Sequence, residues 1–170
     1  MPDRLGSAFD SADAKSRYVR RLFSTIADRY DLITVLLSYG QDRRWKRRLV
    51  AMAPISPGVR VLDLACGTGD ITYALADAGA SSVGLDITAR MVEIARGKRP
   101  RATTSRFLVG DMMALPFGDA TFDVVTTGYG IRNVPVIAEA VAEMARVLRP
   151  GGVLLSLDFD VQNQLIRAAG

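Results

Sequence analysis

The sequence predicts an α/β fold, a doubly wound parallel sheet preceded by a helical lid. From Arg60 onward, short apolar runs alternate with stretches of helical periodicity, a pattern typical of strands joined by crossover helices. The first apolar run breaks at a glycine turn and continues directly into a helical stretch. The 170 residues, 49% of them hydrophobic, are enough for one domain with one core.

The first part of the chain is expected to be helical. Residues 1–13 are small and polar and are predicted to be flexible. In residues 14–59, the predicted lid, apolar side chains recur at intervals of three and four. The first helix carries this stripe, a second covers 31–37, and a third begins at Asp42, which can cap it, and ends before Pro54. The stripe consists of Tyr18, Leu22, Phe23, Ile26 and Tyr30.

Residues 60–170 are predicted to form the α/β core. The expected strands are 61–64, 82–85, 105–109, 122–126 and 153–159. The helix after the first strand is expected to end near Gly79, and further helices to cover 88–97, 135–148 and 161–169. Residues 149–152 are expected to link the helix over 135–148 to the last strand.

The glycine turn lies in the stretch VLDLACGTGD, residues 61–70. Gly67, Thr68 and Gly69 let backbone N–H groups approach a ligand at a helix N-terminus. The turn lacks the full G-x-G-x-x-G pattern and the Lys of a phosphate-binding loop, and Asp70 opens the helix, which disfavours a pyrophosphate. A cationic or neutral ligand such as S-adenosylmethionine fits better, although the glycines could also serve only a tight strand-to-helix turn.

Acids follow three successive predicted strands, where open parallel sheets bind ligands. Asp63 or its neighbours, Asp86 and Asp111 hold these positions. Asp86 is placed to accept both hydroxyls of a ribose, and Asp111 to accept from an adenine amino group with Met112 packed on the ring. The alternative for each acid is a helix N-cap; a cap by Asp86 by itself is credible, but three coincident caps are less so.

Composition excludes several kinds of chemistry. The chain has no histidine and a single cysteine, Cys66, so Ser-His-Asp and Cys-His catalysis and the usual zinc sites are excluded, and no metal is expected. No apolar run has the length of a membrane span and the first residues do not resemble a signal peptide. We therefore expect a cytoplasmic protein, and import of a longer precursor into an organelle stays open.

Positive charge is concentrated before residue 61, where 12 Lys and Arg face 6 Asp and Glu. Its densest part surrounds Trp45 and comprises Arg43, Arg44, Lys46, Arg47 and Arg48. This segment could be a solvated helix face or contact an anionic membrane surface. Nucleic-acid binding is the weaker interpretation, because no aromatic stacking platform accompanies the charges.

Several motifs in order resemble one enzyme family. VLDLACGTGD, GLDIT, GDMMALPF, FDVVTTGYGIRNV and RVLRPGGVLLSLDF resemble class I methyltransferases that use S-adenosylmethionine, and more closely the C-methyltransferases of menaquinone and ubiquinone biosynthesis. The helical stretch FSTIADRYDLITVLLSYGQDRRWK resembles the entry segment of that family. The resemblance implies a Rossmann-like fold and cofactor contacts at Gly67, Thr68, Gly69, Asp86, Asp111, Met112 and Gly128.

The resemblance also implies a substrate and a reaction. The implied substrate is a prenylated quinol, with demethylmenaquinol favoured, and it is methylated on a ring carbon. Arg132, Asn133 and Tyr30 match positions that face the quinol ring in that family. A fixed Arg132 can stabilise the phenolate that makes the ring electron-rich. Alternatively, Arg132 is a surface cation and Asn133 an N-cap before Pro135. Because such a substrate lives in a bilayer, peripheral membrane contact by the basic segment is expected.

The chain departs from the family after the fifth strand. Class I methyltransferases usually have two more strands, which the residues after Phe159 cannot supply, so the core is expected to be incomplete at its C-terminus. The fifth strand is then an exposed edge, which a second copy or another partner could cover. A fragment, a shortened isoform and a truncated relative that binds S-adenosylmethionine or a partner without turnover stay open as alternatives.

Overall fold

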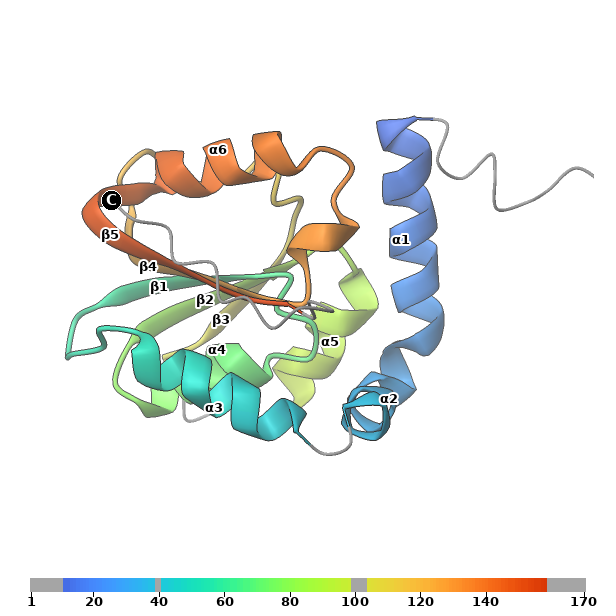
Figure 1. Ribbon diagram of the computed structural model, residues 1–170, viewed down its shortest axis with the longest axis horizontal. Coiled ribbons are helices and arrows are strands. Elements are labelled where there is room, and N and C mark those ends of the chain that lie inside the picture. Colours follow the sequence, from blue (N-terminus) through green and yellow to red (C-terminus); the bar gives the residue numbers. More distant parts are fainter. Residues whose placement is uncertain (1–10, 39–40, 99–103, 159–170) are drawn as a thin grey trace, which may run out of the picture.

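The computed structural model describes residues 11–38, 41–98 and 104–158. A five-stranded, fully parallel sheet with the strand order β3-β2-β1-β4-β5 forms its centre. In Figure 1, α3, α4 and α5 cover one face of this sheet and α6 covers the other. The strands are β1 (Arg60–Leu64), β2 (Ser81–Asp86), β3 (Arg106–Val109), β4 (Phe122–Gly128) and β5 (Leu148–Leu157). The helices are α1 (Ala12–Ile26), η2 (Ala27–Arg29), α2 (Tyr30–Leu37), α3 (Asp42–Met52), α4 (Asp70–Asp77), α5 (Ala89–Lys98), η3 (Ile131–Asn133) and α6 (Ile137–Val147).

The two central strands are buried on both faces, which explains why they read as continuous apolar runs. On the α6 face, Leu62 and Val125 pack with Met144 of α6. On the opposite face, Val61 and Val124 pack with helices α3 and α4, to which Leu49 and Leu75 belong. These two apolar layers hold the sheet rigid beneath the ends of its strands, where the chain turns into its loops.

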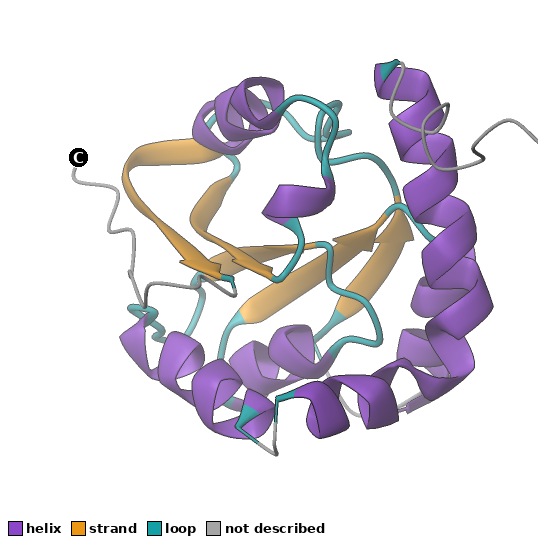
Figure 2. Cartoon of the chain, turned by 45° about the vertical axis from the view of Figure 1, so that its right-hand side comes forward, coloured by secondary structure: helices purple, strands orange, loops and turns teal. Residues whose placement is uncertain are grey.

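Helices α1 and α2 lie beside the sheet rather than on one of its faces. Figures 1 and 2 show α1 standing across the end of the sheet toward which the strand arrows point. Together α1, η2 and α2 form a helical arm, and contacts of α1 and η2 with α5 hold it in place. One ion pair of the arm joins Asp28 to Arg90 of α5, with Nη2 and Oδ1 2.6 Å apart. The helical periodicity of this part of the sequence is confirmed by α1, α2 and α3.

The expectation that Asp42 caps α3 is wrong. Gln41 occupies the N-cap position without a side-chain hydrogen bond, and Asp42 is the first helical residue. Its carboxylate is 2% exposed and pairs with Lys46 one turn along the helix, with Nζ and Oδ2 2.8 Å apart. A lysine four residues on competes with the backbone for the carboxylate, because residues i and i+4 share one helix face.

The start of β5 also differs from the expectation. The strand begins at Leu148, directly after α6, so residues 149–152 belong to the strand and do not form a separate link. Leu148 pairs with Phe122, and the next pair is Val124 with Val153, so the register shifts between them. Gly151, at φ 78°, supplies the backbone conformation of this bulge. The predicted helix over 161–169 lies outside the described residues, and within those described no helix is long and apolar enough to cross a membrane.

Candidate functional site

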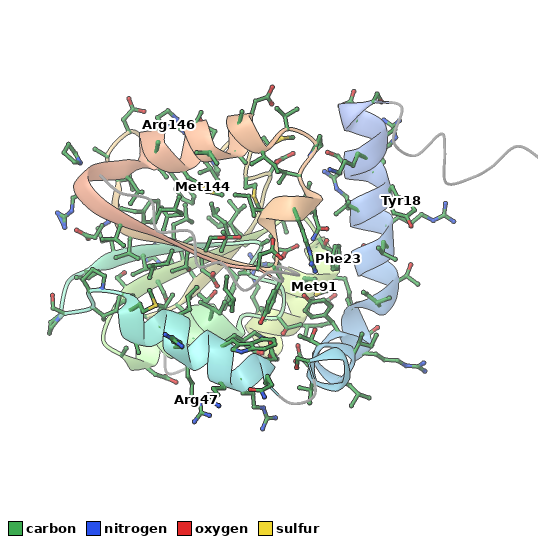
Figure 3. All side chains as sticks on the ribbon, viewed as in Figure 1. Tyr18, Phe23, Arg47, Met91, Met144 and Arg146 are labelled. Carbon is green, nitrogen blue, oxygen red and sulfur yellow. The ribbon has the colours of Figure 1, made fainter. Side chains whose placement is uncertain are left out.

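A pocket lies at the carboxyl ends of the strands, between the sheet and α1. Its floor consists of residues that follow β1, β2, β3 and β4, and its outer wall comes from α1, Tyr30 and the stretch 133–135. Figure 3 shows Phe23 of α1 and Met91 of α5 directed into the region between α1 and the sheet. Both side chains line the pocket, so the helical arm closes it from outside.

Asp86 joins two of the loops that form the floor. Its Oδ2 accepts a hydrogen bond from the Gly67 N–H (2.8 Å) and its Oδ1 accepts from the Thr88 N–H (2.8 Å). The side chain is 7% exposed, and burial raises the pKa of its carboxyl above the ordinary value, against the effect of these two N–H donors. Asp86 thus caps the turn into α5 and lines the pocket at the same time. Each carboxylate oxygen still has a second lone pair to offer.

Asp111 and Met112 line the pocket beyond the end of β3. The Asp111 carboxylate accepts a hydrogen bond from the Met113 N–H (2.9 Å) at Oδ1. Met112 is buried and belongs to the core cluster under α6, so its side chain joins the core to the pocket wall. This places a polar acceptor next to an apolar surface, the combination that a purine ring with an amino group requires.

Strained backbone gathers at this pocket. Ala65 has φ 51° and Tyr129 has φ 61°, and both line it. Gly128 and Gly130 flank Tyr129, and a Cβ added to Gly130 would lie 2.3 Å from the Cβ of Ala65. Non-glycine residues in the left-handed region cost free energy and tend to mark functional sites. Ala65 and Tyr129 are not among the residues predicted from the sequence, although a bulky residue between two glycines at a strand end was an available signal for Tyr129.

Two tyrosines line the pocket, Tyr30 from the start of α2 and Tyr129 from directly after β4. Tyr30 comes from α2 and its ring meets Phe23 edge-on, with centroids 5.9 Å apart. Burial raises the pKa of Tyr30, against a hydrogen bond with Thr34. Burial also raises the pKa of Tyr129, and the Asp42 carboxylate raises it further. Both phenols therefore keep their protons at neutral pH, and the Tyr129 hydroxyl interacts with the Asp42 carboxylate.

Asp63 lies below the pocket and does not line it. It is 1% exposed, and its two oxygens accept hydrogen bonds from the hydroxyls of Thr72 (2.6 Å) and Thr126 (2.9 Å). Burial raises the pKa of Asp63 to about 6, and the two hydroxyl donors limit the shift. The structure therefore gives this acid a place inside the fold, joining β1 to α4 and β4.

The three residues of the glycine turn have different surroundings in the structure. Gly67, at φ 53°, lines the pocket, whereas Gly69, at φ 88°, is the N-cap of α4 and packs against Phe107. The Thr68 hydroxyl donates to Asp31 Oδ1 of α2 (2.6 Å) and points away from the pocket lining. Thr68 thus fastens the helical arm to the turn.

Lys98 of α5 completes this attachment. Its ammonium donates to Asp31 Oδ2 (2.7 Å), to Thr68 Oγ1 (2.8 Å) and to Asp70 Oδ1 (2.8 Å). Lys46 binds the other oxygen of Asp70 at 3.0 Å. Burial acts against ionisation of Asp70, but the two lysines hold its pKa below the ordinary value. The acid that opens α4 is therefore charged and already paired with cations.

Asn133 and Arg132 lie on η3 with different surroundings. Asn133 lines the pocket, and its amide donates to the Tyr129 carbonyl (3.2 Å). The alternative that Asn133 caps α6 is wrong, because that helix begins at Ile137 and Val136 is its N-cap. Arg132 is exposed, forms an ion pair with Asp158 (Nε to Oδ1, 3.4 Å) and is outside the pocket lining.

The pocket has a definite electrostatic character. Of the described residues that line it, the charged ones are Asp86 and Asp111, both acids, and the rest are apolar, glycine or neutral polar. A phosphate would meet two carboxylates here without a cation in the lining. A nucleoside that carries a positive sulfonium would meet carboxylates that accept from its ribose hydroxyls, an apolar wall beside its base and negative charge for its cation. S-adenosylmethionine thus fits the residues present.

The parallel sheet in the order 3-2-1-4-5, with its pocket at the carboxyl ends of the strands, has the Rossmann-like fold of the class I methyltransferases. A chain in the complex between the Haloferax volcanii Trm112 methyltransferase activator and its methyltransferase partner superposes with a TM-score of 0.69 at 30% identity, over 79% of this chain and 58% of that one. At the level of sequence, residues 11–169 match the ubiE/COQ5 methyltransferase family, and the chain belongs to that family.

Curated relatives agree with this assignment. The demethylmenaquinone methyltransferase of Thermus thermophilus is 48% identical over 141 residues, which cover 81% of this chain and 64% of the relative. That of Renibacterium salmoninarum is 42% identical over 149 residues, covering 88% of this chain and 62% of the relative. The chain therefore spans less than two thirds of the length of these relatives.

Proposed function

We propose that this protein is a C-methyltransferase that moves a methyl group from S-adenosylmethionine to a ring carbon of a prenylated quinol, demethylmenaquinol before others. One observation carries the proposal: a chain of this methyltransferase family has, at the carboxyl ends of its strands, a pocket whose charged lining is acidic. The relatives named above carry the name of that reaction.

Three groups would bind the cofactor, which when bound supplies the methyl group from its sulfonium. Asp86 would accept from the ribose hydroxyls with the lone pairs that Gly67 and Thr88 leave free. Asp111 would accept from the adenine amino group, with Met112 against the ring. Gly67 and Gly128 line the pocket without side chains, so the methionine part could approach the backbone there.

The quinol ring would lie between Tyr30 and Asn133. Holding the ring carbon close to the methyl donor supplies much of the rate enhancement in such transfers. The Tyr30 hydroxyl and the Asn133 amide are donors that could orient the quinol oxygens. Arg132 would stabilise the phenolate from the rim, directly or through water, after leaving its present pairing with Asp158.

The proposal is tested by binding and turnover on the full chain. Isothermal titration with S-adenosylmethionine and with S-adenosylhomocysteine should give saturable, one-to-one binding. Incubation with demethylmenaquinol under reducing conditions should then give menaquinol, detected by mass spectrometry as a gain of one methylene unit. Binding without methyl transfer would contradict the proposed reaction, and the absence of binding would contradict the cofactor site as well.

A double-mutant cycle separates the ligand role of Asp86 from its role as a cap. Asp86→Ala should weaken binding of S-adenosylhomocysteine, but losing the Gly67 and Thr88 bonds could do so too. The second arm is therefore the analogue that lacks both ribose hydroxyls. If Asp86 accepts from the ribose, the substitution should cost this analogue less affinity than it costs the parent ligand. Equal losses would leave Asp86 a helix cap only.

Two partner contacts complete the proposal. Arg43, Arg44, Arg47 and Arg48 are exposed on α3, and Figure 3 shows Arg47 directed away from the sheet. We propose that this face touches anionic lipid, so flotation with anionic but not neutral liposomes is expected, and equal recovery would refute it.

Within the described residues β5 pairs with β4 alone, and a second copy across that edge is proposed. A monomer at all soluble concentrations, by light scattering, would refute this contact.

A further inference from the structure

The loop that joins β3 to β4 carries three residues of the pocket lining, Gly110, Asp111 and Met112, but has no helix or strand of its own. It runs over residues 110–121 and presents Asp111 and Met112 to the pocket. A backbone outside regular structure needs other partners for its N–H and C=O groups. Where those partners lie decides how firmly this wall of the pocket is held.

Two side chains of α6 supply them. Arg146 donates from Nη1 to the Phe117 carbonyl (2.7 Å) and from Nη2 to the Leu115 carbonyl (3.1 Å). Glu143, one turn earlier, accepts the Leu115 N–H at Oε2 (2.7 Å). Both polar groups of the Leu115 backbone are thus bound by one pair of side chains, three residues beyond Met112.

The pair is itself rigid. Arg146 binds Glu143 in a fork, with Nε to Oε1 at 2.7 Å and Nη2 to Oε2 at 2.8 Å. Hydrogen bonding to Arg146 lowers the pKa of Glu143 to about 2, so the pair stays charged across the neutral range. A planar guanidinium that bonds a carboxylate in this way fixes its remaining N–H directions. Those N–H groups end on the Leu115 and Phe117 carbonyls and on the Asp119 carboxylate, all of them in the loop.

The same loop is fixed on its apolar side by the core. Leu115 and Met112 pack in the cluster that contains Met144 of α6. The ring of Phe117 meets that of Phe122 edge-on, with centroids 5.0 Å apart. Figure 3 shows Met144 and Arg146 on the same helix, Met144 directed toward the sheet and Arg146 at the outer side. The loop is therefore held between polar groups outside and apolar groups inside.

We infer that Arg146 and Glu143 are positioning residues for the cofactor, which set the place of Asp111 and Met112 through the backbone of the loop. The inference rests on the proposed cofactor site. Neither side chain lines the pocket, so neither would touch the ligand. Their effect is transmitted through Leu115 and Phe117.

The test compares Arg146→Met with Arg149→Met in the full chain. Arg149 lies three residues on and pairs with Asp123, away from the loop carbonyls, so it controls for loss of an arginine and its ion pair. For Arg146→Met we expect the Kd of S-adenosylhomocysteine to rise about tenfold or more, because small displacements of binding groups are costly. The KM of the quinol at saturating cofactor should change less than about twofold.

Amide hydrogen exchange gives a readout besides activity. The Leu115 and Met113 amides should exchange faster in Arg146→Met than in wild type, and at the wild-type rate in Arg149→Met. Glu143→Gln retains an acceptor for the Leu115 N–H and should weaken binding less than Arg146→Met. If Arg146→Met does not fold, Arg146→Lys replaces it, since lysine cannot hold Glu143 and two carbonyls with one fork.

The outcomes are distinct. An unchanged Kd with faster Leu115 exchange would overturn the inference, because the loop would be loosened without consequence for the site. Equal losses of affinity in Arg146→Met and Arg149→Met would overturn it too, since the effect would then be general. A wild-type protein that does not bind S-adenosylhomocysteine would instead refute the proposed function, a result that no comparison of variants can mimic.

Discussion

Replacing Asp63 with asparagine is expected to stabilise the protein at neutral pH and to remove one part of its pH dependence. Asp63 is buried between β1, α4 and β4, and burial raises its pKa to about 6 despite hydrogen bonds from Thr72 and Thr126. In the unfolded chain an aspartate titrates near a pKa of about 3.9. The folded protein therefore keeps a proton on Asp63 at pH values where the unfolded chain has lost it.

The sign and size follow from this difference. Between about pH 4 and pH 6 the folded state binds more protons, so the free energy of unfolding falls as the pH rises, and above pH 6 the loss is complete. A shift of roughly two pKa units corresponds to about 3 kcal/mol. Asparagine avoids the ionisation, since its carbonyl can accept from Thr72 while its NH₂ donates to the Thr126 hydroxyl.

Urea denaturation followed by circular dichroism measures the effect. Asp63→Asn should exceed wild type by up to about 3 kcal/mol at pH 7.5 and by about 1 kcal/mol at pH 4.5. Other titrating groups are common to both proteins and cancel in this comparison. Asp13→Asn, the same change at an exposed acid of α1, controls for formal charge. Parallel stability curves for wild type and Asp63→Asn would refute the reasoning.

Two further predictions concern the pocket and the arm. Gly130→Ala should lower the free energy of unfolding by roughly 1–3 kcal/mol in urea denaturation and weaken S-adenosylhomocysteine binding, because the new Cβ would lie 2.3 Å from that of Ala65. The control is Gly97→Ala, where the new Cβ would have nothing within 4 Å, so its effect on stability should be neutral or favourable. Equal effects of the two substitutions would contradict this prediction. Lys98→Met should expose α1 and α2 to limited proteolysis and remove about 1 kcal/mol of salt-dependent stability. Arg90→Met, which breaks only an exposed pair of the arm with α5, should do less, and identical digestion of the two variants would argue against a special role of Lys98.

The core of the fold could be predicted because its signals are local. Central strands of a parallel sheet are buried on both faces, so their apolar runs appear directly in the sequence. The beginning of β5 could not be found in this way. A Pro-Gly-Gly stretch indicates a turn, whereas here the pairing of Leu148 with Phe122 draws it into the strand as a bulge. Tertiary pairing overrode a correct local signal.

The contacts of the arm could not be predicted for a different reason. Lys98 meets Asp31 and Thr68, residues 67 and 30 positions away, and its sequence neighbourhood shows only a basic residue near a helix end. Such contacts depend on how α2 and α5 meet in space. For the same reason the sequence pattern groups Thr68 with Gly67 as a ligand residue, although the Thr68 hydroxyl donates to Asp31.

The three acids at the strand ends show what a sequence pattern can and cannot locate. Each follows an apolar run, yet Asp86 and Asp111 line the pocket while Asp63 lies inside the fold. The difference is the point at which the chain leaves the sheet. Asp86 is the last residue of β2 and Asp111 lies two residues beyond β3, whereas Leu64 follows Asp63 and still pairs with Leu85 and Thr127.

At the carboxyl end of a parallel sheet, an acid faces a ligand when it lies at or past the last paired residue of its strand. Before that point its side chain is covered by the layer packed on that face of the sheet. One residue of uncertainty in a strand boundary is therefore enough to exchange a ligand group for a buried acid. The two kinds of acid also differ in what their loss should do. Removing Asp63 should change stability without changing cofactor affinity directly, whereas removing Asp86 should change the affinity in proportion to the ribose hydroxyls present.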